Sequence, residues 1–118
     1  MSILGEAIVQ RETSGLGRYS DPGLLILSSL AGGPKHGYSM MEDILAFSGT
    51  RLEPGTLYGA LTRLERRGWV EALPAEERRR PYRLTAEGLE ALRAQLQTMR
   101  RIVSVGLDRL AEAGGAPG

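Results

Sequence analysis

Residues 54–84 decide the fold, and they read PGTLYGALTRLERRGWVEALPAEERRRPYRL. The first part of this stretch carries Leu57, Leu61 and Leu64 at positions i, i+4 and i+7, the spacing of one face of a helix. Gly68 is expected to end that helix, because glycine commonly stands just past the last helical residue. The three leucines therefore predict an amphipathic helix whose inner face packs on a core.

The opposite face of the same predicted helix combines small side chains with arginines. Half a turn of the helical wheel away from the leucines lie Gly55, Gly59, Thr62, Arg63 and Arg66. A face made of small residues can approach another surface closely, and arginines at its far end can then reach bases or phosphates. The alternative interpretation is an ordinary solvent-exposed face that contacts nothing.

A charged loop follows, between two segments that have the composition of short strands. Residues 69–73 and 82–84 contain the aromatic and β-branched residues that strands favour. The loop between them, residues 74–81, holds two prolines that discourage further pairing. Its tip would present Arg78, Arg79 and Arg80. This layout predicts a β-hairpin wing beside the arginine-bearing helix.

Two further helices are expected before this stretch. The first has a start signal in Asp21 and Pro22, a capping side chain followed by proline at the first helical position, and it ends at residues 32–34. The second has apolar residues at helical spacing and ends at residues 48–50. Those apolar residues are Tyr38, Met41, Ile44 and Leu45.

A long helix is expected after the wing, from an N-cap at Thr85 to about Leu110 or Ala111. Its apolar residues are spaced alternately by three and four positions, as in a heptad seam: Leu89, Leu92, Leu96, Met99, Val103, Gly106 and Leu110. A helix of about 26 residues is about 39 Å long, more than a small domain needs to cover its own core.

We expect this seam to pair two copies of the chain, because a symmetric dimer is the commonest soluble oligomer. The residues assigned to the dimer interface are Leu89, Leu92, Leu96, Met99, Val103 and Leu110, with Gly106 leaving a gap in the last repeat. Part of the seam is alternatively explained by packing back on the first helix and the N-terminal segment.

The expected fold is mainly α with a small β-hairpin (α+β), a winged helix-turn-helix with a long C-terminal dimerisation helix. The expected division of the chain is residues 1–20 as an N-terminal helix and linker, 21–84 as the winged DNA-binding domain, 85–112 as the dimerisation helix and 113–118 as a flexible tail.

The composition is that of a globular protein, with 42% hydrophobic and 25% charged residues among 118. The absence of cysteine and the single histidine, His36, argue against disulfides, zinc sites and cysteine nucleophiles. No nucleophile, base and orienting acid form a set, so neither an enzyme nor a cofactor is expected. No apolar run approaches the roughly 20 residues of a membrane span, so we expect a soluble cytoplasmic protein with no membrane partner.

The net charge of +1 conceals a local basic region. Residues 51–83 hold eight Arg and five Glu, whereas residues 1–50 carry a net charge of −2 and residues 84–118 balance. Lys35 is the only lysine in the sequence. Arginine suits bidentate contacts to phosphate or guanine better than lysine does, although a solvated charged face is the commoner explanation of any one such cluster.

Three blocks of the sequence carry a resemblance to a known family. They are HGY at residues 36–38, GTLYGALTRLERRG at residues 55–68 and YRLTAEG at residues 82–88. In order and spacing they closely resemble the PadR family of transcriptional regulators, over roughly residues 24–92. That family comprises bacterial and archaeal homodimeric repressors, which commonly govern responses to phenolic acids, drugs or other small molecules.

The resemblance implies that the arginine-bearing helix enters the major groove, that the wing touches the adjacent backbone or minor groove, and that the C-terminal helix pairs protomers. By position, Thr56, Tyr58 and Arg63 match family residues near DNA. Leu57 and Leu61, with Leu64, match the family's core. The single-helix C-terminus fits the family's small subgroup.

Two positions depart from the family pattern. Tyr58 is followed by Gly59 where the family usually has proline, which loosens the start of the helix. In the wing, Glu76 and Glu77 precede the arginines where the family usually carries glycine.

Three side chains have more than one interpretation. His36 makes a local hydrogen bond at the start of the second helix, which is the commoner role, or it senses pH or touches phosphate. Tyr58 is a phosphate-contacting hydroxyl, a half-buried aromatic, or both. Trp69 packs in the core beneath the wing, the commoner role, or forms a platform for a ligand.

The expected function is a homodimeric, sequence-specific DNA-binding transcriptional regulator. It would be a repressor that reads an inverted-repeat operator on double-stranded DNA and is released by a small-molecule inducer of unknown identity. The residues assigned to DNA binding are Thr56, Tyr58, Gly59, Thr62, Arg63, Arg66, Arg78, Arg79 and Arg80. The alternative is a winged-helix module that binds other proteins without DNA.

Overall fold

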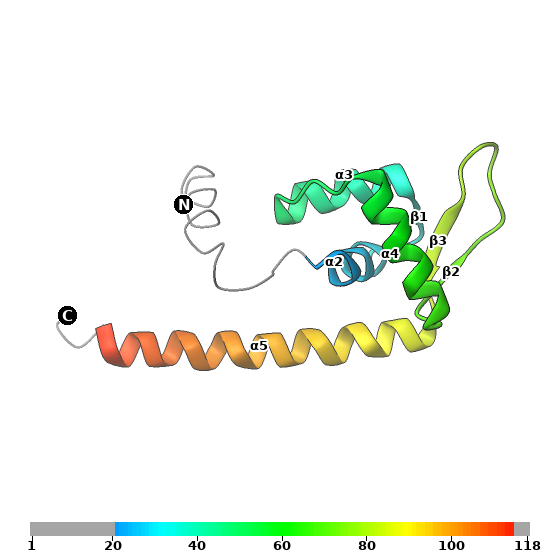
Figure 1. Ribbon diagram of the computed structural model, residues 1–118. Helices are drawn as coiled ribbons and strands as arrows, with labels where there is room; N and C mark the ends of the chain where they lie inside the picture. The colour runs from blue at the N-terminus through cyan, green and yellow to red at the C-terminus, as the bar shows by residue number, and fades with distance from the viewer. Residues whose placement is uncertain (1–20, 115–118) are drawn as a thin grey trace.

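The computed structural model describes residues 21–114, arranged as Figure 1 shows. In chain order the elements are α2 (Pro22–Leu30), β1 (Lys35–His36), α3 (Gly37–Ser48), α4 (Pro54–Arg66), β2 (Val70–Ala72), β3 (Pro81–Leu84) and α5 (Ala86–Gly114). The predicted winged helix-turn-helix with a long C-terminal helix is confirmed. The N-terminal helix expected within residues 1–20, and residues 115–118 of the expected tail, lie outside the described residues.

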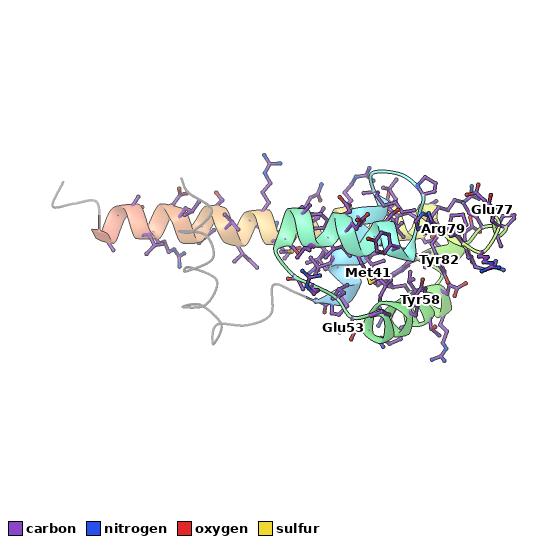
Figure 2. The ribbon with its side chains drawn as sticks, turned by 90° about the horizontal axis from the view of Figure 1, so that it is seen from above. Met41, Glu53, Tyr58, Glu77, Arg79 and Tyr82 are labelled. Atoms are coloured by element: carbon purple, nitrogen blue, oxygen red, sulfur yellow. The ribbon has the colours of Figure 1, made fainter. Side chains whose placement is uncertain are left out.

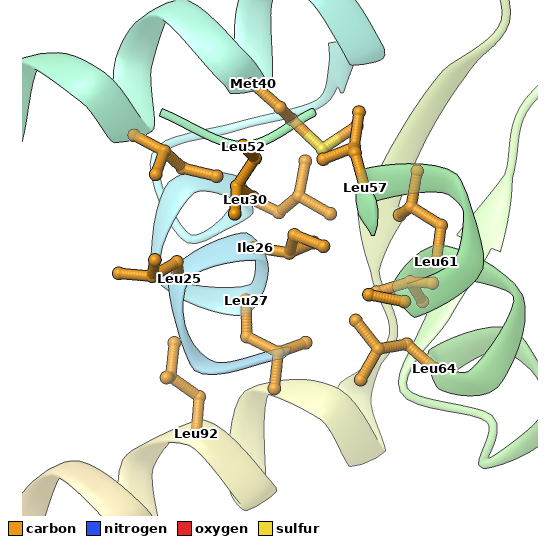
Figure 3. Close-up of a cluster of buried hydrophobic side chains, with 13 residues drawn as sticks. Leu25, Ile26, Leu27, Leu30, Met40, Leu52, Leu57, Leu61, Leu64 and Leu92 are labelled. Atoms are coloured by element: carbon orange, nitrogen blue, oxygen red, sulfur yellow. The ribbon is translucent and has the colours of Figure 1, made fainter. Parts of the chain in front are cut away.

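Helix α2 is the centre of the fold, because it contacts α3, α4 and α5. Figure 1 shows it between α5 on one side and α3 with α4 on the other. Its sequence is apolar nearly all round, which is the pattern of a buried helix. Leu25, Ile26, Leu27 and Leu30 are buried, and Figure 3 shows Ile26 directed towards Leu61 of α4 and Leu27 towards α5. One small core therefore joins all four helices of residues 21–114.

Polar contacts fix both ends of α2. At its start, the Asp21 carboxylate accepts hydrogen bonds from the backbone amides of the first turn at 2.8 and 3.2 Å, and Pro22 follows, so the predicted start signal is confirmed. At its end, Lys35 Nζ donates to the Ser29 carbonyl oxygen at 2.6 Å. The buried Ser29 hydroxyl donates to Asp43 of α3 at 2.6 Å, so it is satisfied and ties the two helices together.

The inner face of α3 is formed by only some of its apolar residues. Met40 and Ile44 are fully buried, whereas Tyr38 is 60% exposed and Met41 is only partly buried. Of the four apolar residues at helical spacing, Ile44 lies in the core and Tyr38 lies outside it. Two adjacent methionines and several apolar neighbours satisfy helical spacing in more than one register, and the helix start at Gly37 selects the register in which residues 37, 40 and 44 face inwards.

The sheet has one strand more than the predicted hairpin. Within residues 21–114 it is three-stranded with the order β1-β3-β2, and both pairings are antiparallel. Strand β1 consists of Lys35 and His36, which lie opposite Tyr82 and Pro81 of β3. A strand of two residues is too short to show an alternation of apolar and polar residues, so the sequence pattern does not predict it.

The end of α4 has a left-handed glycine cap. Gly68 adopts a φ of 78°, which glycine reaches without strain. Its amide donates to the Glu65 carbonyl at 2.9 Å, and the Trp69 amide donates to the Leu64 carbonyl at 3.0 Å, which is the Schellman pattern. The predicted stop at Gly68 is confirmed, and the cap sets the direction in which the chain leaves α4.

The start of α5 is bound to this same cap. The Thr85 hydroxyl donates to the Gly68 carbonyl at 2.5 Å and accepts from the Gly88 amide at 3.0 Å, which confirms Thr85 as the N-cap residue. The Thr85 amide donates to the Trp69 carbonyl at 3.0 Å. Gly88 is buried so closely against that carbonyl that a Cβ atom at position 88 would overlap with it. We call residues 68, 69, 85 and 88 the corner.

Helix α5 is longer than predicted. It has 29 residues, about 43 Å at 1.5 Å per residue, and it includes Ala113 and Gly114, which the prediction placed in the tail. Figure 1 shows its C-terminal half extending past the winged domain. No helix within residues 21–114 combines the length and apolarity needed to cross a membrane.

We predict that Gly88→Ala destabilises the fold by about 2 kcal/mol or more, since the added methyl group meets backbone that other hydrogen bonds hold in place. Gly55→Ala is the matched control. Gly55 also lies in the first turn of a helix, but nothing lies within 4 Å of its would-be Cβ, so this change leaves stability equal or slightly higher. Urea unfolding followed by circular dichroism measures both, and equal midpoints for the two variants would contradict the packing described at the corner.

Candidate nucleic-acid interface

The outer face of α4 is largely exposed within residues 21–114. Leu57, Leu61 and Leu64 are buried as predicted, so the opposite side of the helix faces outwards. The exposed residues of that side are Thr56, Tyr58, Thr62, Arg63 and Arg66, with Gly59 half-buried among them. All six positions assigned to DNA contacts on this helix therefore lie on one accessible surface.

The small residues of this face leave room for its polar groups. Arg63 Nη1 lies 3.7 Å from the place where a Cβ of residue 59 would stand, so Gly59 gives the guanidinium space to lie along the helix. The Thr62 hydroxyl donates to the Tyr58 carbonyl at 3.0 Å, so its remaining capacity towards solvent is that of an acceptor. The face offers a cation, an acceptor and little steric bulk.

Among residues 21–114, neither Arg63 nor Arg66 makes a side-chain hydrogen bond or ion pair within the chain, so both guanidinium groups are available. Arg67 differs, because its guanidinium lies over the Trp69 ring at 4.8 Å from the centroid. Trp69 is partly buried against the core, as its commoner interpretation predicted.

The wing closes in a tight turn whose conformation is unusual for its sequence. The backbones of Glu76 and Arg79 exchange two hydrogen bonds, at 2.6 and 2.9 Å, so Glu77 and Arg78 form the tip. Glu77 has a φ of 58°, a left-handed conformation that side chains other than glycine rarely adopt. The departure noted from the sequence, glutamates in place of glycine, is thus accommodated by one strained residue.

The three arginines of the wing have different partners. Arg79 Nη1 lies 3.1 Å from His36 Nε2, and Arg80 Nη1 donates to the Leu73 carbonyl at 3.0 Å. Arg78 has no such side-chain partner within residues 21–114. A guanidinium has five N–H donors, so Arg79 and Arg80 keep most of theirs for another molecule.

Two tyrosines connect α4 to the wing. Tyr58 is 47% exposed, and its hydroxyl occupies the space that a side chain at Gly37 would need, so its ring is both half-buried and accessible. Burial raises the pKa of Tyr82 above its ordinary value of 10.0, nearby Glu65 and Tyr58 raise it further, and Arg80 opposes them. Figure 2 shows Tyr58, Tyr82 and Arg79 towards the same end of the molecule, and α4 packs against β2, a strand at the base of the wing.

Sequence reasoning missed the contacts that meet at residues 36 and 37. It assigned His36 a local hydrogen bond, and Ser39 of α3 does lie against the imidazole, at 3.2 Å from Oγ to Nε2. It did not anticipate that Arg79 lies against the same ring, or that the Tyr58 hydroxyl lies against Gly37. The HGY block was a signal of these contacts, but sequence gives no distance between residues 36 and 79.

The apolar face of α5 divides into a covered part and an open part. Leu92, which the sequence assigned to the dimer interface, is only 4% exposed and belongs to the hydrophobic core. On either side of Leu92 the face is open in the described part of the chain. Leu89, Leu96, Val103 and Leu110 are exposed, and Met99 is half-buried. Ile102, Val105 and Leu107, which lie outside the heptad positions, are exposed as well.

No group of three or more histidine, aspartate or glutamate side chains within residues 21–114 could hold a metal ion. The candidate surface therefore consists of a helix face with small residues, arginines and a tyrosine, flanked by an arginine wing. Such a surface is suited to a polyanion with grooves.

Comparisons with known proteins agree with this geometry. A family model described as the transcriptional regulator PadR-like family matches residues 26–94. A solved PadR family transcription regulator from Clostridium difficile is 30% identical, with 75% of this chain and 97% of that chain covered and a TM-score of 0.68. A transcriptional regulator from Clostridium thermocellum is 28% identical, with 73% and 89% covered and a TM-score of 0.64.

Two further comparisons say less about function. A winged-helix DNA-binding protein from STIV, 20% identical with a TM-score of 0.63 over 68% of this chain and 88% of that one, shares the fold. An uncharacterized 37.1 kDa protein in transposon TN4556 of Streptomyces fradiae is 45% identical over 85 residues, which are 72% of this chain. The chain spans about a quarter of the length of that curated relative.

Family model, solved relatives and surface geometry agree, and the resemblance drawn from the sequence is confirmed. The chain belongs to the PadR-like family of transcriptional regulators, which bind DNA through a winged helix.

Proposed function

We propose that this protein is a homodimeric repressor that reads an inverted-repeat operator with α4, holds the backbone with its wing and is released by a small molecule. The observation that carries the DNA-reading part is the outer face of α4, which is accessible, small and arginine-bearing, and lies next to a wing with three arginines. The dimer and the release by a ligand rest on the open face and the groove along α5.

The proposed roles of α4 and the wing follow from their chemistry. The major groove admits a helix, and a helix face with Gly55 and Gly59 meets the walls of the groove with little steric resistance. Thr62 and Arg63 lie on the part of this face that would meet base edges, where arginine pairs with guanine through two hydrogen bonds. The wing carries charge on a turn of only a few residues, which suits contacts to phosphate more than to bases.

The proposed dimer uses the open part of the α5 face. Reading two half-sites on one side of a duplex requires two recognition helices held about 34 Å apart, and one protomer has no means of setting that distance. Leu96, Val103 and Leu110 expose 43%, 56% and 69% of their surface in one protomer, which is costly in water unless a partner covers them. Leu92 is left out of this proposed interface, because α2 already covers it.

The proposed ligand site is a groove between α2 and α5. Its volume is about 490 Å³, within the range of small-molecule sites. Its lining is mainly apolar, with Leu24 and Leu27 from α2, Met99 and Val103 from α5, and Trp69. A planar apolar or aromatic molecule would suit such a lining. Because the groove borders the open face, the second protomer would complete it.

We predict that Arg78→Ala combined with Arg80→Ala weakens binding about equally on all duplex sequences. Removing two phosphate contacts lowers the slope of log affinity against log salt by up to about 2. The control is Arg93→Ala, which removes an arginine of α5 that is paired with Glu90 at 3.0 Å and should leave the slope unchanged. Titrations of labelled duplex at several salt concentrations measure both. A slope near zero for the unmodified protein would instead favour the protein-binding alternative.

We predict that Thr62→Ala or Arg63→Ala alters sequence preference. Loss of a base contact should cost about 1–3 kcal/mol on the preferred site and much less on other duplexes. Selection from random duplexes, carried out with the unmodified protein and with each variant, gives the comparison. The proposed roles are reversed if the selected sequences stay the same in these variants and change in the wing variant.

We predict that Leu96→Asp gives a monomer at micromolar concentration, because each protomer would place a carboxylate in an apolar interface near its copy. The exposed position of Leu96 means that the winged domain itself stays folded. Ser104→Asp is the control, since this exposed residue of the same helix lies outside the apolar face. Sedimentation measures the oligomeric state. A Leu96→Asp protein that remains dimeric would show that the dimer is built elsewhere.

A further inference from the structure

The junction of β1 and α3, at His36 and Gly37, contacts both α4 and the wing, the two elements that the proposed function assigns to DNA binding. Gly37 lies against the hydroxyl of Tyr58, so it meets the accessible face of α4. His36 lies 3.1 Å from Arg79, so it meets the wing. Two adjacent residues therefore sit between the recognition helix and the wing, although neither belongs to them.

The contact between His36 and Arg79 has a defined chemical direction. A guanidinium only donates hydrogen bonds, so a hydrogen bond between Arg79 Nη1 and the imidazole needs Nε2 as the acceptor, which is the arrangement of the tautomer with its proton on Nδ1. In that tautomer Nδ1 carries a proton, so it does not accept from the Ser39 amide, 3.5 Å away. Two groups lie against Nε2, the Arg79 guanidinium at 3.1 Å and the Ser39 hydroxyl at 3.2 Å. The Arg79 contact is the shorter of the two.

Little else holds the wing tip to the body of the domain. The last backbone bond between its two arms runs from the Leu73 amide to the Pro81 carbonyl at 2.8 Å. Within residues 74–80 the further backbone bonds are those between Glu76 and Arg79, which close the tip on itself. The side chain of Arg79 thus connects the tip to the body at residue 36, 43 positions away in the chain.

We propose that His36 is a positioning residue for DNA binding. By accepting a hydrogen bond from the Arg79 guanidinium, it latches the wing to the start of α3, next to Gly37, which contacts Tyr58 of α4. The latch fixes the angle between wing and recognition helix before DNA arrives. Arg79 keeps its charge and its other donors, so it still faces phosphate. This inference rests on the proposed function of the wing.

The latch should raise affinity by reducing the conformational entropy that the wing loses on binding, and not by adding positive charge. A free wing must be ordered when it meets DNA, and immobilising one long side chain typically costs a factor of about three to ten in affinity. Loss of the latch is therefore expected to weaken binding by about that factor, while the slope against salt stays the same because no cation has been removed.

The experiment uses two substitutions that separate the latch from the cap of α3. His36→Ser retains a side chain that caps helices well but is too short to reach Arg79. His36→Gln retains an uncharged acceptor of similar reach. Each is combined with Arg79→Ala. Affinity for a mixed-sequence duplex is measured over a salt series, and amide hydrogen exchange at Glu76 and Arg79 is measured in the protein without DNA.

We expect His36→Ser to bind about three to ten times more weakly with an unchanged salt slope, and to exchange faster at the wing tip. His36→Gln should restore both to near the original values. In the Arg79→Ala background, His36→Ser should cause no further loss, because the partner is already missing. These three results together would support the latch.

Two results would overturn the proposal. One is a His36→Ser protein with unchanged affinity and unchanged exchange at the tip. The other is an equal loss from His36→Ser with and without Arg79, since His36 would then act through another group. If the unmodified protein bound no duplex, the proposed function would fail, and hydrogen exchange at the tip would still decide whether the latch exists.

Discussion

The corner at the end of α4 is the constraint on which the arrangement of this protein depends. One glycine cap turns the chain out of α4, and the Thr85 hydroxyl bonds that cap and the first turn of α5 at 2.5 and 3.0 Å. Gly88 brings the helix backbone against the Trp69 carbonyl with no side chain between them. The helix that would read DNA, α4, thus ends at the same corner at which the helix that would bind a partner, α5, begins. Their relative direction is set by short hydrogen bonds, not by a flexible linker.

This placement suggests how the proposed ligand could influence DNA binding. Trp69 is the residue that follows the glycine cap, its amide donates to the Leu64 carbonyl of α4, and it lines the groove between α2 and α5. Arg67, in the last turn before the cap, stacks on the same ring. A molecule in the groove that displaced this ring would act directly on the end of α4. A small movement there matters because two half-sites tolerate little change in the spacing of the helices that read them.

Sequence was sufficient wherever a feature depends on local pattern. Three leucines at helical spacing gave the inner face of α4, and Gly68 and Thr85 gave its end and the start of α5, because capping is decided by one or two residues. The features that were missed depend on contacts between distant segments. Strand β1 exists only because β3 lies beside it, and the contacts of His36 and Gly37 come from residues 79 and 58. Leu92 follows the heptad as well as Leu96 does, yet α2 covers one and not the other.

The preference for arginine over lysine in this chain is consistent with side chains that both hold the fold and bind another molecule. Lys35, the only lysine, is committed to the fold, since its ammonium donates to the Ser29 carbonyl at 2.6 Å and lies 3.9 Å from Asp43. An ammonium has three donors at one point, so such a commitment leaves little for another molecule. Arg79 uses one donor of its planar group on His36 and Arg80 uses one on the Leu73 carbonyl, so each keeps most of its five donors. Arginine therefore suits a wing of so few residues, because one donor can hold the side chain in place while the others remain for another molecule.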